Sequence, residues 1–387
     1  MRETGYYITK VVPGESYRAF VPHPLPPNPP LQLGAEDDLL REEATHALGR
    51  LDGLTAALPD IGLFLYHYVR KEALLSSQIE GTQSSLSELL LFEEAGAPGV
   101  PLDDIQEVSN YAAAIQHGVA RLSGGFPLSS RLIREVHGVL LSKGRGSDQS
   151  PGEFRRTQNW VGGTRPGNAR HVPPPPELVP ECMSDLEKFL HAERRHGPAL
   201  VKAALLHAQF ETIHPFLDGN GRMGRLLITL YLHAAGLLRQ PALCLSLYFK
   251  SDRAKYYELL QRVREYGDWE EWMRYFLRGV RETAIQAAAA IDRSLAIFAE
   301  HRQWIRSQGR HVSSTLRVHE ALQRRPIVSI PRAAKESGLT PPTVASAMAT
   351  LAGLQLVREI TGKRRGRFFL YQPFWEILAE GTDPLPR

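Results

Sequence analysis

A short glycine-rich turn between two apolar segments constrains this chain more than any other part of its sequence. The turn runs from His214 to Arg225 and reads HPFLDGNGRMGR. Apolar residues recur at helical spacing before it, at positions 206, 210 and 213, and again after it from 226 to 234. A packed core has no use for the charged side chains of such a turn. The pattern therefore predicts two buried helices joined by a functional loop.

The side chains of this turn are those that a phosphate-handling site requires. Its glycines allow backbone N–H groups to converge at the start of the second helix, where the helix dipole also favours an anion. Arg222 and Arg225 share the first helical turn and can both reach phosphate oxygens. Asp218 is a hard oxygen ligand suited to Mg²⁺, and His214 is the natural base for a hydroxyl nucleophile. Together they predict a phosphate-binding active site.

The setting of the turn excludes two other phosphate motifs. Its glycines at 219, 221 and 224 formally match the dinucleotide-binding pattern GxGxxG, but that pattern requires a preceding strand and this turn follows a helix. A Walker A loop is excluded because no Gly-Lys-Ser/Thr closes the turn. The simpler alternative is a polar surface loop with a capping Asp218 and solvated arginines. It accounts for any one residue but not for the whole set.

The composition is that of a globular protein without secretory or membrane features. Hydrophobic residues make up 43% of the 387 residues. The first thirty residues lack the apolar core of a signal peptide, and no run approaches the roughly 18 apolar residues of a membrane helix. Cys182 and Cys244 form no Cys/His cluster, which argues against a zinc site. We therefore expect a cytoplasmic protein that is not bound to a membrane.

Sequence patterns divide the chain into an extended arm, a helical body and a C-terminal unit. Residues 21–30 are too proline-rich for a helix or a central strand and predict the arm. Residues 144–176, rich in Gly, Pro and Arg, predict a long loop with a short hairpin. From residue 311 a helix, a short strand, two helices and a basic hairpin predict a winged helix-turn-helix domain. The helices predicted before it are 36–52, 63–80, 103–122, 129–142, 177–195, 198–213, 252–266, 268–279 and 282–307.

The turn from His214 to Arg225 resembles the signature of Fic-domain proteins, because it matches every fixed position of His-x-Phe-x-Asp-Gly-Asn-Gly-Arg-x-x-Arg. Most Fic proteins are adenylyltransferases that move AMP from ATP onto a hydroxyl of a protein. The resemblance implies that His214 deprotonates this hydroxyl and that Asp218 holds Mg²⁺ on the α- and β-phosphates. It implies that Arg225 holds the γ-phosphate. The other residues implied in phosphate binding are Gly219, Asn220, Gly221 and Arg222.

A second motif, Ser76-x-x-x-Glu80-Gly81, resembles the inhibitory motif of Fic proteins. Ser76 and Glu80 share one helix face. By this resemblance Glu80 pairs with Arg225 in the place meant for the γ-phosphate, so that ATP binds only in a nonproductive pose. An ordinary helix-terminal glutamate is the simpler interpretation of the motif alone, but not beside a catalytic motif. In some relatives the same glutamate supports removal of AMP, which leaves a bifunctional enzyme as an alternative.

Two further segments resemble the nucleotide- and target-binding parts of Fic domains. The loop 152–163, followed by the proline run that starts at Val172, resembles the Fic flap, which covers the nucleotide and captures the target by strand addition. The target protein would dock on residues 154–163. The residues on the nucleotide side would be Trp160, Val161 and Gly162. Tyr257 falls where relatives place the adenine pocket, although paired tyrosines in a helix are as often simple packing.

The C-terminal unit carries the chain's excess of basic over acidic residues. Residues 311–387 hold 11 Lys/Arg against 6 Asp/Glu, whereas the whole chain has a net charge of only +4. The basic residues of the wing, placed to contact DNA phosphates, are Lys363, Arg364, Arg365 and Arg367. The helix from Thr340 to Leu351 contains no Arg, Lys, Asn or Gln, the side chains that commonly read bases. We therefore expect protein docking or a homodimer contact here more than DNA binding.

These features together predict an all-α Fic fold with a small β-hairpin flap, followed by a winged helix-turn-helix domain. The expected divisions are an N-terminal region with the inhibitory motif (1–102), a catalytic core (103–281), a connector helix (282–309) and the winged domain (310–387).

The expected activity is ATP- and Mg²⁺-dependent transfer of AMP to a Ser, Thr or Tyr hydroxyl of a target or of the chain itself, held in check by Glu80. One alternative is a DNA-binding regulator with a vestigial Fic domain, which the intact His214, Asp218 and Asn220 disfavour. Another is a Fic-type kinase. That branch of the family carries Lys where this chain has Gly221, so the kinase is also disfavoured.

Overall fold

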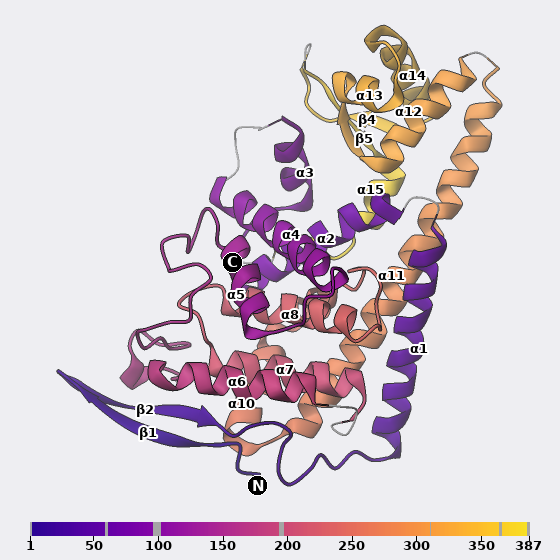
Figure 1. Ribbon diagram of the computed structural model, residues 1–387. Helices are drawn as coiled ribbons and strands as arrows, with labels where there is room; N and C mark the ends of the chain where they lie inside the picture. Colours follow the sequence, from indigo (N-terminus) through magenta and orange to yellow (C-terminus); the bar gives the residue numbers. More distant parts are fainter. Residues whose placement is uncertain are drawn as a thin grey trace.

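The computed structural model describes residues 2–58, 61–95, 102–192, 197–309, 311–363 and 366–384. Helices form most of the molecule, and two small antiparallel sheets lie at opposite ends of it (Figure 1). The predicted mainly helical class is confirmed. Within these ranges, no helix is both long and apolar enough to cross a lipid bilayer.

The helices of the body are α1 (Ala35–Ala57), α2 (Ile61–Ile79), α3 (Leu86–Ala95), α4 (Leu102–Ser123), α5 (Ser130–Leu140), α6 (Val179–His191), α7 (Ala199–Ile213), α8 (Asn220–Ala234), α9 (Leu245–Ser251), α10 (Arg253–Tyr266) and α11 (Trp269–Arg306), with 3-10 turns η1 (Pro166–Asn168) and η2 (Pro176–Leu178).

Helices α7 and α8 form the buried centre of the body. Every residue of α7 from Leu200 to Ile213 is buried, and so are most residues of α8. Helices α2, α4, α6 and α11 pack around this pair. Apolar residues on all sides of a helix indicate such a central position. The loop that joins the two helices is therefore fixed at both ends by the core, as the sequence predicted.

A single 38-residue helix, α11, runs along α1 and reaches the C-terminal unit (Figure 1). The prediction of two separate helices at 268–279 and 282–307 is therefore wrong. Gly279 lies at the expected break, but a Cβ there would stand 2.7 Å from the Tyr248 ring and 3.1 Å from Leu245. The glycine allows close packing against α9 rather than ending the helix.

An N-terminal β-hairpin, which the sequence interpretation missed, precedes the proline-rich arm. Strands β1 (Gly5–Val12) and β2 (Glu15–Pro22) pair antiparallel through their whole length and project from the body (Figure 1). Both segments are rich in β-branched and aromatic residues, and the turn between them contains Gly14 at a φ of 88°. This is the usual sequence signal of a hairpin.

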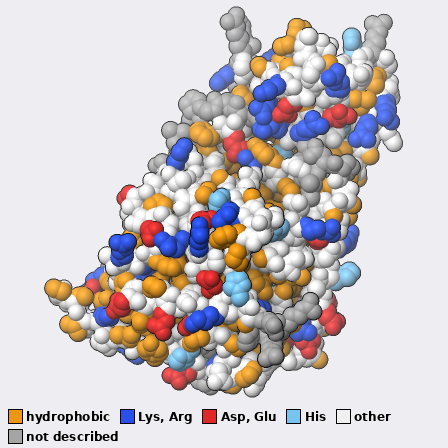
Figure 2. All heavy atoms as spheres, in the orientation of Figure 1, with side chains coloured by type: hydrophobic (Ala, Val, Ile, Leu, Met, Phe, Trp, Pro, Cys, Tyr) orange, Lys and Arg blue, Asp and Glu red, His pale blue; other side chains and the backbone are white. Residues whose placement is uncertain are grey.

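The C-terminal unit has the element order that the sequence predicted for a winged helix. Its elements are α12 (Val312–Arg324), β3 (Ile327–Ser329), α13 (Ile330–Ser337), α14 (Pro341–Gly353), β4 (Val357–Glu359) and β5 (Phe368–Tyr371), followed by α15 (Gln372–Ala379). The strands form an antiparallel sheet of order β3-β5-β4, and most of the unit's buried apolar residues form a cluster of their own. Lys and Arg side chains gather on this unit in the upper part of Figure 2. The wing residues Arg364 and Arg365 lie outside the described residues.

Candidate active site

The loop between α7 and α8 is held in shape by bonds within itself. His214 ends α7 in a left-handed conformation with φ 48°, and Gly219 precedes α8 with φ 76°. The Asn220 amide closes the loop, because its Oδ1 accepts from the Phe216 N–H at 2.9 Å and its Nδ2 donates to the Phe216 carbonyl at 2.8 Å. The Asn220 side chain, which the resemblance implied in phosphate binding, is thus committed to loop closure. The N–H groups at the start of α8 remain available to face an anion.

His137 of α5 contacts this loop at Phe216 and Asp218 and was not identified from the sequence. Its ring stacks on Phe216 with centroids 3.6 Å apart and an interplanar angle of 4°. Its Nδ1 accepts from the Gly152 N–H at 2.9 Å, so its Nε2 carries the proton and donates to the Asp218 carbonyl at 3.0 Å. Burial lowers the pKa of His137 to about 4, and the ring stays neutral. No local sequence pattern marks this residue.

The predicted base, His214, is positioned through its backbone. Its carbonyl accepts from Arg155 Nε at 2.9 Å and from Asn159 Nδ2 at 3.3 Å. Its Nδ1 is buried and has no hydrogen-bond partner among the described residues. Burial, followed by the positive charges of Arg264 and Arg155, lowers the pKa of His214 to about 3. The imidazole is therefore neutral at pH 7 and has a lone pair to accept a proton.

Arg222 and Asp218 lie together at the start of α8. The Arg222 side chain is only 1% exposed, with Nη1 3.1 Å from Glu107 Oε1 and Nη2 3.6 Å from Asp218 Oδ2. These distances define ion pairs, but none of the three guanidinium nitrogens makes a well-aligned hydrogen bond among the described residues. Arg145 Nε stands 4.0 Å from the same Asp218 oxygen. The cluster therefore has donors that a phosphate oxygen can still engage.

Arg225 is the most tightly held side chain of the loop. Its Nε donates to Ser76 Oγ at 2.8 Å and its Nη2 to the Ser76 carbonyl at 2.9 Å. Nη2 also donates to Glu80 Oε1 at 2.7 Å. The Arg225 side chain is 2% exposed and that of Glu80 is 25% exposed. The structure thus brings Arg225 to Ser76 and Glu80, which precede it in the sequence by 149 and 145 positions.

Glu80 occupies the space in front of the α8 N-terminus. A Cβ added to Gly221 would stand 2.3 Å from Glu80 Oε1, so the carboxylate lies directly over this glycine. Burial alone would raise the pKa of Glu80, but the attraction and hydrogen bond of Arg225, with help from Arg222 and Arg145, lower it. The carboxylate is therefore ionised at neutral pH. Gly81 follows with a φ of 104°, a conformation that favours glycine.

Glu211 is a second buried carboxyl in this region and was also missed. It lies on the last turn of α7, and Gly224 makes room for it, since a Cβ at 224 would stand 2.4 Å from Glu211 Oε1. Burial raises its pKa to about 7, although Arg225 opposes the shift. The third glycine of the apparent dinucleotide motif thus serves helix packing rather than nucleotide binding.

Residues 39–120 match the family model described as Fic/DOC family N-terminal, and residues 127–232 match the model described as Fic/DOC family. The chain therefore contains a Fic N-terminal domain and a Fic domain. The Fic domain contains α5 to α7, the loop between α7 and α8, and α8 up to residue 232. The Fic N-terminal domain contains all of α2.

Curated Fic relatives carry the name protein adenylyltransferase Fic. One from Culex quinquefasciatus is 34% identical over 202 residues, which is 51% of this chain and 37% of the relative. One from Drosophila ananassae is 32% identical over 200 residues, again 51% of this chain and 37% of the relative. The chain thus spans less than two fifths of the length of these relatives.

Solved Fic structures share the fold. A Fic family protein from Desulfovibrio desulfuricans G20 superposes with a TM-score of 0.57 at 20% identity, over 89% of this chain and 98% of that chain. Fic-1 (aa134–508) from C. elegans superposes with a TM-score of 0.52 at 25% identity, over 69% of this chain and 74% of that chain.

The flap of this Fic protein is mostly irregular. The predicted hairpin reduces to one antiparallel bridge, Val161 to His171, flanked by the left-handed Gly162 and Gly163. Side chains anchor the flap instead, because they donate to carbonyls of the loop between α7 and α8 and of the flap itself. The Phe20 N–H of β2 donates to the Val172 carbonyl at 2.8 Å, so the N-terminal hairpin covers one flap edge. Trp160 is 37% exposed on the other segment.

The two tyrosines near the expected adenine pocket differ in their surroundings. Tyr256 is fully buried and hydrogen-bonded to His207 Nε2 at 2.9 Å, so it serves packing. Tyr257 is only partly buried, and Arg253 lies over its ring at 5.5 Å. Burial and the nearby Glu80 raise the pKa of Tyr257 to about 12, although Arg225 opposes the shift. Tyr257 is thus close enough to the Glu80–Arg225 pair to sense both charges.

Proposed function

We propose that this Fic protein transfers AMP from ATP to the hydroxyl of a Ser, Thr or Tyr side chain, in a target protein or in itself. The observation that carries the proposal is the convergence at the start of α8 of a neutral imidazole, an aspartate and two arginines. The names of the curated relatives support the same activity. Positioning and charge neutralisation are the main sources of rate in such reactions.

His214 accounts for the proton that the reaction releases. The hydroxyl oxygen attacks the α-phosphorus, the bond from that phosphorus to the bridging oxygen of the β-phosphate breaks, and pyrophosphate leaves. The hydroxyl proton passes to the neutral His214. Its low pKa in the free protein makes it a weak base, and the negative charge of a bound triphosphate raises its proton affinity.

Asp218 is the residue that would hold Mg²⁺. Its Oδ1 accepts from the Gly219 N–H at 2.7 Å, and its side chain is 28% exposed. Magnesium is commonly bound by one or two carboxylates together with substrate phosphates, and Asp218 fits that pattern. When bound, the ion would neutralise phosphate charge.

We further propose that Glu80 inhibits the site. Its carboxylate pairs with Arg225 and covers Gly221 at the anion-binding end of α8. A γ-phosphate at Arg225 would compete with this carboxylate for the same guanidinium, and two anions cannot share the space. Gly221 makes room for this carboxylate, because a Cβ there would stand 2.3 Å from Glu80 Oε1.

Transfer of label from ATP to protein tests the proposal. Glu80→Gly should label itself from ATP carrying ³²P at the α-phosphate, and adding His214→Ala should abolish the label. Label from the γ-phosphate alone would establish a kinase instead. Label from neither position, with a gel shift of duplex DNA at low salt, would favour the regulator. Loss of label after the purified product is returned to the wild-type chain would establish AMP removal.

A further inference from the structure

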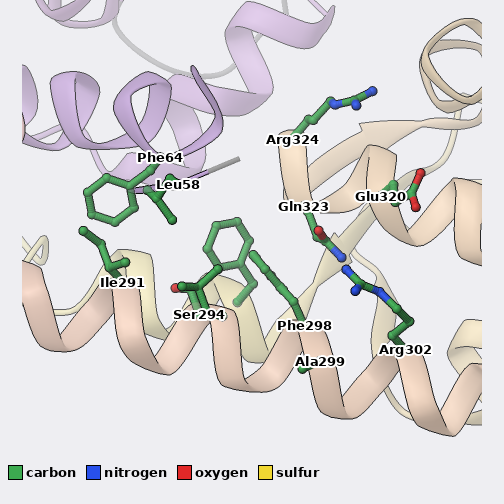
Figure 3. Close-up of a pocket in the computed structure, with 12 residues that line it drawn as sticks. Leu58, Phe64, Ile291, Ser294, Phe298, Ala299, Arg302, Glu320, Gln323 and Arg324 are labelled. Atoms are coloured by element: carbon green, nitrogen blue, oxygen red, sulfur yellow. The ribbon is translucent and has the colours of Figure 1, made fainter. Parts of the chain in front are cut away.

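A pocket of about 360 Å³ lies where α2, α11 and the C-terminal unit meet (Figure 3). Aromatic and aliphatic side chains line most of it, among them Phe64 of α2, Ile291 and Phe298 of α11 and Phe374 of α15. Small-molecule sites typically have volumes of about 300–1,000 Å³, and many lie between structural units. None of the lining residues belongs to the candidate active site.

Polar side chains gather at one end of this pocket. The Arg302 guanidinium points toward Gln323 of α12, and Glu320 lies farther from the aromatic rings (Figure 3). Within the described ranges, Arg302 makes no ion pair or hydrogen bond. An unpaired guanidinium beside an apolar wall is complementary to a molecule with an apolar body and one anionic group.

The elements around the pocket also hold both ends of α2. Near its start, His67 Nε2 donates to the Arg324 carbonyl at 3.2 Å, and its ring meets Phe374 edge-to-face with centroids 5.8 Å apart. Near its end, the buried Gln78 donates to the carbonyl of Thr382, in the segment after α15, at 3.0 Å. Gln78 lies two residues before the inhibitory glutamate. Because α2 is one continuous helix, packing at the pocket bears on the position of that glutamate.

We propose that this pocket, lined by Phe64, Phe298, Phe374 and Arg302, binds a small apolar molecule carrying one anionic group, and that binding favours the conformation in which Glu80 is paired with Arg225. The second half of the proposal rests on the proposed function of Glu80, whereas the first half stands without it.

Whether a bound ligand strengthens or weakens inhibition follows from the state of Glu80 in the conformation that contains the pocket. The structure contains the pocket and the Glu80–Arg225 pair together. A ligand shifts a protein toward the conformation that it binds more tightly, by no more than the difference in affinity. Occupation of the pocket is therefore expected to reinforce inhibition rather than relieve it.

Binding is tested on the full chain with the fluorescent sulfonate anilinonaphthalene sulfonate, displaced by decanoate or by decylamine at pH 7. Saturable binding that decanoate displaces better than decylamine is expected. Ala299→Trp, which fills the pocket from its exposed rim, and Arg302→Glu should each weaken binding about tenfold, or ~1.4 kcal/mol. Ala289→Trp adds the same ring at an exposed position of α11 outside the pocket and should bind as the wild type does. No saturable binding, or equal binding by all four proteins, overturns the site.

Coupling to Glu80 is tested first without any activity. Decanoate should slow amide hydrogen exchange at residues 76–81 of the wild type but not of Ala299→Trp. Binding without this protection overturns the regulatory half.

The labelling assay then separates the two proposals. Decanoate should lower the α-label incorporated by the wild type several-fold and leave Glu80→Gly unchanged. An equal loss in both proteins, or no loss in the wild type, contradicts the coupling. If Glu80→Gly takes up no label at all, the proposed function fails, and the binding and exchange results still decide the pocket.

Discussion

Replacing Glu80 with glycine is expected to destabilise the free protein and to strengthen its response to ATP. The change removes the 2.7 Å hydrogen bond from Arg225, whose side chain is 2% exposed. Breaking a fully buried ion pair costs about 3–5 kcal/mol. Arg225 retains its two bonds to Ser76, and Glu80 is 25% exposed, so the loss should be smaller, about 1–2 kcal/mol.

Binding of ATP should stabilise Glu80→Gly and so oppose this loss of stability. Without the carboxylate, Arg225 and the N–H groups of α8 are free to hold a triphosphate. A ligand present at a hundred times its Kd stabilises the folded state by about 2.7 kcal/mol. Mg²⁺ and ATP should therefore raise the Tm of Glu80→Gly by several degrees and that of the wild type by less.

Thermal unfolding followed by fluorescence, with and without Mg²⁺ and ATP, measures both effects. Glu80→Gln is the matched control, because it keeps the length of the side chain and an acceptor oxygen but lacks the charge. Its Tm should lie between those of the wild type and Glu80→Gly. A Glu80→Gly protein as stable as the wild type, with no larger response to ATP, would refute the account of the pair.

Three further changes test other contacts of the structure. Gln78→Ala removes the bond between α2 and the C-terminal segment, so α-label incorporation should rise several-fold over the wild type but stay below that of Glu80→Gly; unchanged labelling would contradict this link. Burial lowers the pKa of both His67 and His214 to about 3. At pH values below about 6.5, the pKa of a histidine in the unfolded chain, the unfolded chain therefore binds more protons than the folded one, and the free energy of unfolding decreases as the pH is lowered. The loss is up to about 1.4 kcal/mol per histidine per pH unit, whereas Glu211, whose pKa burial raises to about 7, contributes the opposite sign over the same range. His67→Gln should therefore lose less stability than the wild type between pH 7.5 and pH 5.5, as measured by urea midpoints, and an equal loss in both proteins would exclude the effect. Trp160→Ala on the exposed flap should slow labelling of target protein in a lysate and keep the thermal response to ATP, whereas loss of both would assign it to nucleotide binding.

Local sequence patterns predicted the centre of the site but not its supports. The loop from His214 to Arg225 was placed between two helices because apolar spacing and glycines are local signals. His137 donates to the Asp218 carbonyl from another helix, α5. Nothing near this residue in the sequence indicates such a role. The carbonyl contacts of Arg155 and Asn159 were missed for the same reason.

The pairing of Glu80 with Arg225 shows a different limit. These residues are 145 positions apart, so neither periodicity nor spacing could join them, and only the resemblance to Fic proteins did. The continuity of α11 was misjudged because Gly279 has the same local sequence whether it ends a helix or admits a neighbouring ring. The N-terminal hairpin could have been predicted, because two β-prone segments lie on either side of Pro13 and Gly14.

The initial rate of AMP incorporation from α-labelled ATP tests the central claim most directly. We expect Glu80→Gly to incorporate label at least about tenfold faster than the wild type, a difference of ~1.4 kcal/mol in the barrier. Glu80→Gly combined with His214→Ala should incorporate none. Equal rates for the wild type and Glu80→Gly would contradict inhibition by Glu80, and label that persists without His214 would contradict the assignment of the active site.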